Sequence, residues 1–83
     1  MSILKVSIRQ IKAARALLNW SQANLALKSG VSEPTIKRLE SPDSGSIGGR
    51  EETAAKLVSA LQEAGIEFID DKRGRGVVRL SPE

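Results

Sequence analysis

Apolar residues recur at steps of three and four positions along most of the first 65 residues of the chain. This spacing places them on one face of an α-helix. It predicts four helices, over about 8–19, 22–28, 33–40 and 50–64. The predicted buried face of the first helix consists of Ile8, Ile11, Ala14, Leu17 and Leu18. Arg9, Lys12 and Arg15 fall off this face and are expected to point to water or a ligand. That of the fourth helix consists of Ala54, Leu57, Val58 and Leu61.

Residues typical of helix ends stand at the limits of these segments. A serine at an N-cap accepts a hydrogen bond from a backbone N–H of the first turn, and Ser7, Ser21 and Ser32 precede the first three helices. Pro34 falls in the first turn of the third helix, where its missing N–H costs nothing. Glycines end helices through left-handed conformations. Gly30 and Gly65 are therefore expected to end the second and fourth helices.

After Gly65 the pattern changes to alternation, which is typical of strands. Residues 66–70 and 77–80 are predicted to pair around a turn at 71–76. The expected fold is mainly α: four helices followed by a C-terminal β-hairpin. We expect a helical domain over 1–65 and the hairpin over 66–83.

Both faces of the predicted hairpin carry apolar side chains. Ile66 and Phe68 face one side and Ile69 the other, and Val77 and Val78 alternate in the same way. A hairpin of two strands is marginal in water on its own. One face can cover the helices, so the hairpin is expected to help form a two-fold dimer, through either a shared sheet or a packed sheet face.

Composition excludes several classes of function. The chain has 83 residues with no Cys and no His, which excludes disulfides, thiol or imidazole catalysis and ordinary zinc sites. No apolar run approaches the roughly 20 residues that span a bilayer, and charges interrupt the start of the chain where a signal peptide needs an apolar core. We therefore expect a cytoplasmic protein with no membrane partner.

Two pairs of acidic residues, Glu51-Glu52 and Asp70-Asp71, are the candidates for carboxylate catalysis. Neither has a metal motif or a base nearby in the sequence, so roles at a helix start and at a hairpin turn are expected instead. The sequence thus predicts no enzyme, no cofactor and no small-molecule substrate.

Positive charge is concentrated in the first half of the chain. Residues 1–40 carry seven basic and two acidic residues, a net of +5, and residues 41–83 carry six basic and eight acidic ones, a net of −2. A basic excess of this size indicates an anionic partner, most often nucleic acid. Solvated helix faces are the alternative.

Residues 22–39 form the most informative pattern. Two short helices flank a turn at Gly30, Ala26 is small enough for a close helix crossing, and Val31, Ile36 and Leu39 are spaced to hold the pair together. Such a pair is a helix-turn-helix, which can place its second helix in the major groove of DNA.

Three stretches of this region resemble one known family. Residues 20–26 (WSQANLA), 30–32 (GVS) and 35–40 (TIKRLE) are similar to the phage-repressor/Cro-type helix-turn-helix transcriptional regulators of the xenobiotic response element (XRE) family. The similarity extends over about 8–64, and residues 64–69 resemble very small bacterial members. The resemblance implies a regulator that binds an operator in double-stranded DNA as a homodimer.

The resemblance also implies which residues meet DNA. Gln22 occupies the position that in the family touches a phosphate from the start of the second helix, with Ser21 beside it; a plain exposed helix start is the alternative for Gln22. The exposed positions of the recognition helix are Glu33, Pro34, Thr35, Lys37 and Arg38. Chemically, Arg38 suits a bidentate contact with guanine, Thr35 a base edge or a thymine methyl, Glu33 the cytosine amino group and Lys37 a phosphate.

Glu33-Pro34 departs from the family, which often has polar base-reading residues there. A carboxylate repels phosphates unless it finds a cytosine amino group, and the alternative role of Glu33 is a helix N-terminal charge. This departure motivates a second hypothesis, a protein-interaction module such as an antitoxin-like or adaptor subunit. Gly45–Gly49 is a candidate phosphate contact or a plain connection, and Trp20 a core anchor or a stacking surface.

Overall fold

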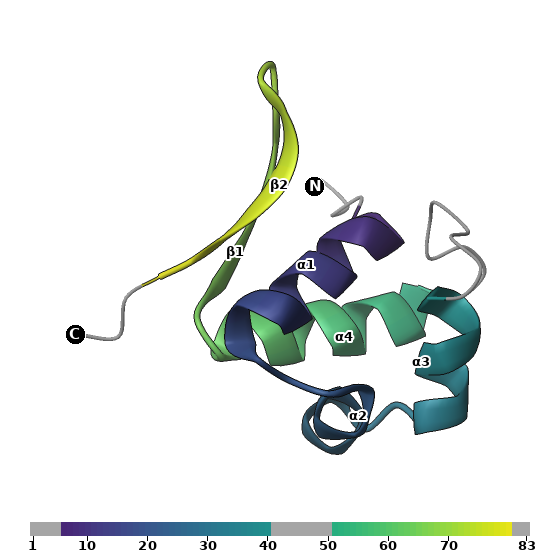
Figure 1. The fold of residues 1–83 in the computed structure, drawn as a ribbon. Coiled ribbons are helices and arrows are strands. Elements are labelled where there is room, and N and C mark those ends of the chain that lie inside the picture. The colour runs from purple at the N-terminus through teal and green to yellow at the C-terminus, as the bar shows by residue number, and fades with distance from the viewer. Residues whose placement is uncertain (1–5, 41–50, 81–83) are drawn as a thin grey trace.

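Four helices and a two-stranded hairpin follow one another along the chain (Figure 1). The computed structural model describes residues 6–40 and 51–80. Its elements are α1 (Ile8–Leu18), α2 (Gln22–Ser29), α3 (Glu33–Glu40), α4 (Glu51–Glu63), β1 (Ile66–Asp71) and β2 (Gly74–Arg79). The predicted fold class, mainly α with a C-terminal hairpin, is confirmed. No helix within the described ranges has both the length and the apolar character needed to cross a membrane.

The predicted serine caps are present at the first three helices. Ser7 and Gln10 form a reciprocal capping box at α1, and Ser21 and Asn24 form another at α2. Ser32 accepts from a backbone N–H in the first turn of α3. Each cap satisfies N–H groups that have no partner within the helix.

Left-handed residues end three of the helical segments. Gly30 caps α2 with φ +81°, and Gly65 follows α4 with φ +101°, both as the sequence predicted. Asn19 caps α1 with φ 59°, so this helix ends at Leu18, one residue earlier than expected. Asparagine adopts this conformation more readily than other non-glycine residues because its short amide bonds locally.

The core lies where the inner faces of the helices meet. Its fully buried large side chains are Ile8, Ile11, Leu25, Ile36, Leu57 and Leu61. Leu39, Ala54 and Trp20 are partly buried against this core, so the anchoring role of Trp20 is confirmed. The prediction for Leu17 is wrong: it is 44% exposed, because the narrow stripe of α1 is already filled by Ile8, Ile11 and Ala14.

The two strands pair antiparallel in one register, with Phe68 opposite Val77 and Ile69 opposite Gly76. The strands are longer than predicted, and their turn is only two residues, Lys72 and Arg73, rather than six. The sequence pattern missed this because the extra paired positions are polar or glycine and show no apolar alternation. Gly74, which closes the turn opposite Asp71, has φ +128°.

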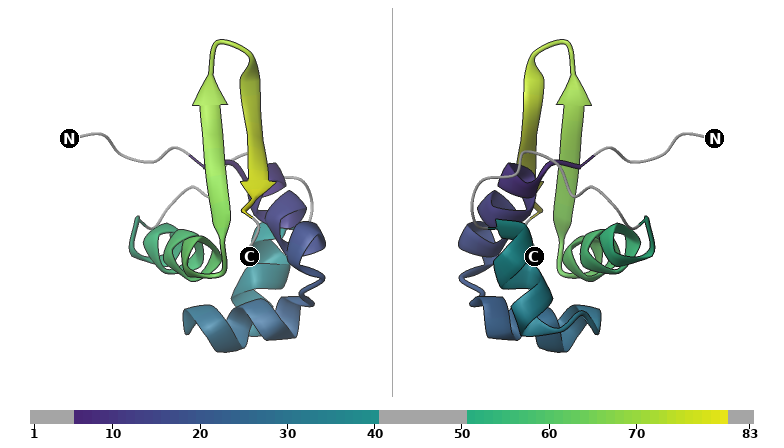
Figure 2. Two further views of the ribbon diagram at one scale, coloured as in Figure 1. Left: turned by 90° about the vertical axis from the view of Figure 1, so that its left-hand side faces the viewer. Right: turned by 90° about the vertical axis from the view of Figure 1, so that its right-hand side faces the viewer.

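One face of the hairpin packs onto the helices. Ile66 is buried in the core, and Phe68 and Val77 pack against it. Gln10 adds a polar link, because its Nε2 donates to the carbonyl oxygens of Ile69 (3.0 Å) and Gly76 (2.9 Å). In the left view of Figure 2 the helices lie behind and below the hairpin, whose tip points away from α2.

Candidate nucleic-acid interface

The turn between α2 and α3 is held by backbone and side-chain bonds. The N–H of Gly30 donates to the carbonyl of Ala26 at 2.9 Å, and the N–H of Val31 donates to Ser29 Oγ at 3.1 Å. Val31 is buried beside the core residues Leu25 and Ile36. These contacts hold the two helices as a rigid pair, as a helix-turn-helix requires.

Helix α3 buries one edge and presents the other. Ile36 and Glu40 are buried, whereas Pro34, Lys37 and Arg38 are exposed. The two exposed cations therefore come from one short segment of a helix that stands at the outside of the molecule (Figure 1). This is the surface expected to enter a groove of DNA.

Three of the predicted site residues on α3, Glu33, Thr35 and Lys37, already have partners. Lys37 Nζ lies 3.8 Å from Glu33 Oε2, one helical turn away, so the carboxylate is partly compensated by a neighbouring cation. Both side chains are largely exposed, and such a pair is weak and readily exchanged for another partner. Thr35 Oγ1 accepts from Ser32 Oγ at 2.8 Å, which leaves the Thr35 hydroxyl hydrogen able to donate elsewhere.

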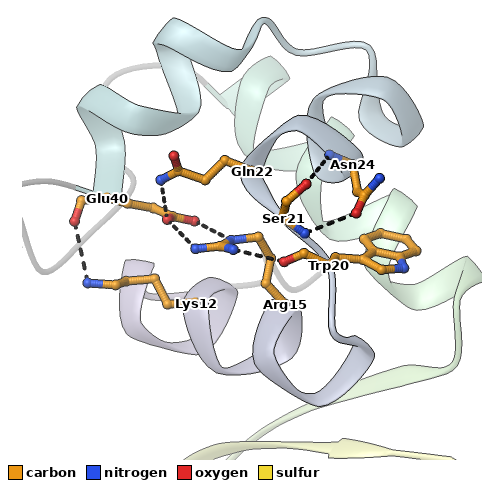
Figure 3. Close-up of polar contacts among 7 residues, drawn as sticks. All are labelled: Lys12, Arg15, Trp20, Ser21, Gln22, Asn24 and Glu40. Atoms are coloured by element: carbon orange, nitrogen blue, oxygen red, sulfur yellow. Dashed lines mark hydrogen bonds and ion pairs between the residues drawn. The ribbon is translucent and has the colours of Figure 1, made fainter.

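A buried ion pair fixes the far end of α3 (Figure 3). Glu40 Oε2 accepts from Arg15 Nε at 3.0 Å, and Glu40 Oε1 accepts from Arg15 Nη2 at 2.7 Å. Arg15 Nη1 also donates to the carbonyl of Trp20 at 2.9 Å. The exposed fraction of the side chain is 19% for Arg15 and 4% for Glu40. The prediction that Arg15 points to water or a ligand is therefore wrong, because its guanidinium joins α1 to α3 and to Trp20, in the connection that precedes α2.

Gln22 contacts the same carboxylate. Its Nε2 donates to Glu40 Oε1 at 2.8 Å, so its side chain lies between α2 and the end of α3 (Figure 3). An amide has two N–H donors, and one of them serves this bond. Ser21, beside it, is exposed and accepts from Asn24 N at 3.0 Å. The structure thus places the Gln22 side chain between α2 and the end of α3, and leaves Ser21 exposed at the surface of the protein.

Sequence reasoning missed Glu40 as a structural residue. A signal was present: Glu40 follows Ile36 by four positions, and Arg15 follows Ile11 by four, so each borders a buried stripe. A charge at such a border is expected to find a partner of opposite sign. Lys12 Nζ lies 3.5 Å from the backbone carbonyl of Glu40 and adds positive charge at the same helix end.

Of the paired acidic residues outside the helix-turn-helix, Glu52 lies at the start of α4 and Asp71 borders the hairpin turn, as predicted, whereas Asp70 lies within β1. Glu52 lies in the first turn of α4 and 4.0 Å from Lys56, and Asp70 lies 3.6 Å from Arg75 across the hairpin. Asp71 accepts from both the side chain and the backbone of Arg73, and these bonds hold the pKa of Asp71 below the ordinary range of an aspartate. The candidate phosphate contact at Gly45–Gly49 lies outside the described residues.

Comparison with known families agrees with this geometry. Residues 11–42 match the family model described as helix-turn-helix, of the XRE type. The matched range begins within α1 and includes all of α2 and α3. A search of curated proteins found no match to the chain. Residues 11–40, the described part of this range, are therefore a helix-turn-helix of the Cro/repressor (XRE) type, and the match supports a DNA-binding domain of a transcriptional regulator.

Proposed function

We propose that the protein is a transcriptional regulator that binds an operator as a homodimer, with α3 of each copy in the major groove. The observation that carries this proposal is the exposed pair Lys37 and Arg38 on α3 of a family-matched helix-turn-helix. The buried Arg15–Glu40 pair supports it, because it holds α3 at a fixed angle to α1. A reading helix needs such rigid support to place its side chains on base edges.

In this proposal some side chains of α3 contact bases and one contacts a phosphate. Arg38 presents two parallel N–H donors to the O6 and N7 of guanine, which is the commonest base-specific contact. Thr35 bonds a base edge or touches a thymine methyl. Lys37 neutralises a phosphate, for which it exchanges its weak pairing with Glu33. Glu33 then accepts from the amino group of a cytosine.

The start of α2 supplies the positioning contacts. Gln22 keeps one N–H on Glu40 and offers the other to a phosphate, and the exposed Ser21 hydroxyl donates beside it. Phosphate contacts of this kind set the position of a protein on the duplex without reading sequence. Gln22 would thereby connect the phosphate backbone to the network that holds α3.

A dimer suits this task because two helix-turn-helix units about 34 Å apart read two half-sites on one face of the duplex. The operator is then expected to be a palindrome. Since the proposed target is DNA, we place the protein in the cytoplasm.

The test is a selection from random duplexes, followed by titration of the enriched sequence at two salt concentrations. We expect an enriched palindrome and an affinity that falls steeply as salt rises, because each neutralised phosphate releases counterions. Salt-insensitive binding, or no duplex binding at all, would rule out the regulator.

One observation favours a second candidate, the protein-interaction module. Leu27 on α2 is 81% exposed, a large apolar side chain directed away from the core. With the carboxylate of Glu33 it suits a protein surface better than a phosphate backbone. Weak binding to all duplexes without enrichment in the same selection would favour this antitoxin-like or adaptor role over operator recognition.

A further inference from the structure

The hairpin has an outer face that the helices leave uncovered. Phe68 and Val77, which are paired, pack against the core. Side chains alternate along a strand, so Ile69 and Val78 point the opposite way, as does Leu80 just beyond β2. Val78 is 40% and Leu80 51% exposed. The left view of Figure 2 shows this face toward the reader, with no helix in front of it.

On this outer face a ridge, formed by Ile69 of β1, lies beside a flat strip, formed by Gly74 and Gly76 of β2. Ile69 stands on β1, and the residues paired with Ile69 and Asp71 on β2 are Gly76 and Gly74. A Cβ atom built at either glycine would meet nothing within 4 Å, so the space above the strip is open. A ridge and a strip of this kind are complementary in shape to a second copy of themselves.

Charge argues against pairing through the open strand edges. The charged residues of β1 are all acidic, and those of β2 are all basic: Glu67, Asp70 and Asp71 against Arg75 and Arg79. A two-fold axis that joins two copies edge to edge pairs β1 with β1 or β2 with β2. Either arrangement brings like charges together across the new ladder, which is unfavourable.

Two outer faces can stack with the two-fold axis either across or along the strands, and the charges favour the axis along them. A two-fold axis across the strands lays β1 on β1 and brings its outer-face acids, Glu67 and Asp71, against those of the other copy. An axis along the strands lays each β1 over β2 of the other copy. The acids then face Val78 and Gly74, which are uncharged, on a strand whose charges are basic.

We propose that the outer face of the hairpin is the homodimer contact, stacked on the same face of a second copy with the two-fold axis along the strands. This inference deepens the proposed function, on whose homodimer it rests. Because paired residues lie at one level, Ile69 of each copy sits over Gly76 of the other. Contacts of this reciprocal kind are what a two-fold interface requires.

The same axis arranges the helices for DNA. The hairpin tip lies at the end of the molecule opposite α2, and α3 lies on the side away from the hairpin (Figure 1). An axis along the strands leaves both helical units at the same end of the dimer, so both α3 helices approach one face of a duplex. An axis across the strands places them at opposite ends.

The experiment is sedimentation equilibrium of the full chain over a wide range of concentration, with Ile69→Lys and Gly76→Val. Each variant is expected to be a monomer where the unaltered protein is a dimer. Gly76→Val fills the open strip. It is not expected to destabilise the fold of the monomer, since Gly76 has an ordinary φ and valine is favoured in strands. Circular dichroism verifies that both variants fold.

Leu27→Lys is the matched control, because it makes the same apolar-to-lysine change on α2 and is expected to leave the dimer mass unchanged. The proposal is overturned if the unaltered protein is monomeric throughout, if both hairpin variants remain dimers, or if Leu27→Lys alone gives monomers.

Duplex titration of the same samples separates this proposal from the proposed function. If the hairpin variants become monomers but the unaltered dimer binds no duplex, the interface is supported and the operator role fails. If the unaltered protein binds the palindrome and the hairpin variants remain dimers, the operator role is supported and this interface fails.

Discussion

Arg15 holds Glu40 through two hydrogen bonds, Nε to Oε2 at 3.0 Å and Nη2 to Oε1 at 2.7 Å. The pair links the last turn of α1 to the last residue of α3 across 25 positions of sequence. A carboxylate buried this deeply is tolerated only because it is paired and fully hydrogen-bonded. The position of α3, the proposed recognition helix, therefore depends on one buried charge and not on its exposed side chains.

Removing that charge is expected to destabilise the fold strongly. Glu40→Ala leaves the guanidinium of Arg15 largely buried without its partner, which costs about 3 kcal/mol in the free energy of unfolding. Urea unfolding followed by circular dichroism measures it. Lys37→Ala breaks only an exposed pair one turn apart and should cost about 0.5 kcal/mol or less. Similar midpoints for the two variants would contradict the structural role of Glu40.

Gln10 is expected to hold the hairpin to α1. Gln10→Glu keeps an acceptor for the capping box but loses the two N–H donors that reach Ile69 and Gly76, leaving both carbonyls facing a carboxylate. The expected cost is about 1–3 kcal/mol, with faster amide exchange in β1 and β2. Asn24→Ala removes the corresponding capping residue of α2, and it should leave hairpin exchange unchanged. Equal exchange rates in the two variants would refute the link.

Two glycines in open space should respond oppositely to alanine. Gly30 has φ +81°, so Gly30→Ala is strained although no atom lies near, and we expect a loss of about 1–2 kcal/mol. Gly76 has an ordinary φ, so Gly76→Ala should be neutral or stabilise the single copy by about 0.4–1 kcal/mol. Thermal unfolding at low protein concentration compares them. A loss at both positions would show that the effect is not one of backbone conformation.

Arg38 and Lys37 should differ in how they weaken DNA binding. Arg38→Ala is expected to cost about 1–3 kcal/mol on the enriched duplex and to relax specificity at one base pair. Lys37→Ala should weaken binding to all duplexes alike and lower the salt dependence by about one charge. Titration of the operator and of single-base variants distinguishes them, and a uniform loss for Arg38→Ala would remove its base-reading role.

Asp71 should titrate below the usual aspartate range, because the side chain and backbone of Arg73 bond its charged form. A group whose pKa is lower in the folded state stabilises that state above its unfolded pKa, and the contribution is lost as pH falls through the folded pKa. Carboxyl NMR shifts measured against pH report the value. In Arg73→Ala the pKa of Asp71 should rise toward the ordinary value, and an unchanged titration would show that another cause dominates.

Local signals in the sequence were sufficient for most of the fold. Helix limits followed from Ser7, Ser21 and Ser32, whose caps depend only on neighbours three positions away. The turn at Gly30 followed from backbone conformation alone. The helix-turn-helix could be identified because it consists of such short-range features in a fixed order.

Features that depend on distant neighbours were not predictable in the same way. Arg15 was assigned to the surface because helical spacing shows which side of α1 it occupies, but not that Glu40 reaches it from α3. Periodicity predicts Leu17 in the core because it shows which side of α1 is buried, but not how many residues around the helix that buried face includes. Gln10 was overlooked because its partners are backbone carbonyls, which leave no trace in residue type.

Gln10 has a consequence for how the chain folds. Its Nε2 reaches both carbonyls only when Ile69 stands opposite Gly76, and a slip of one residue would also turn the apolar set of a strand to the other face. The Gln10 side-chain amide therefore stabilises the native register of the two strands and not a shifted one. Because Gln10 lies 59 and 66 positions from its two partners, these hydrogen bonds close long loops of the chain, and they are expected to form after the helices.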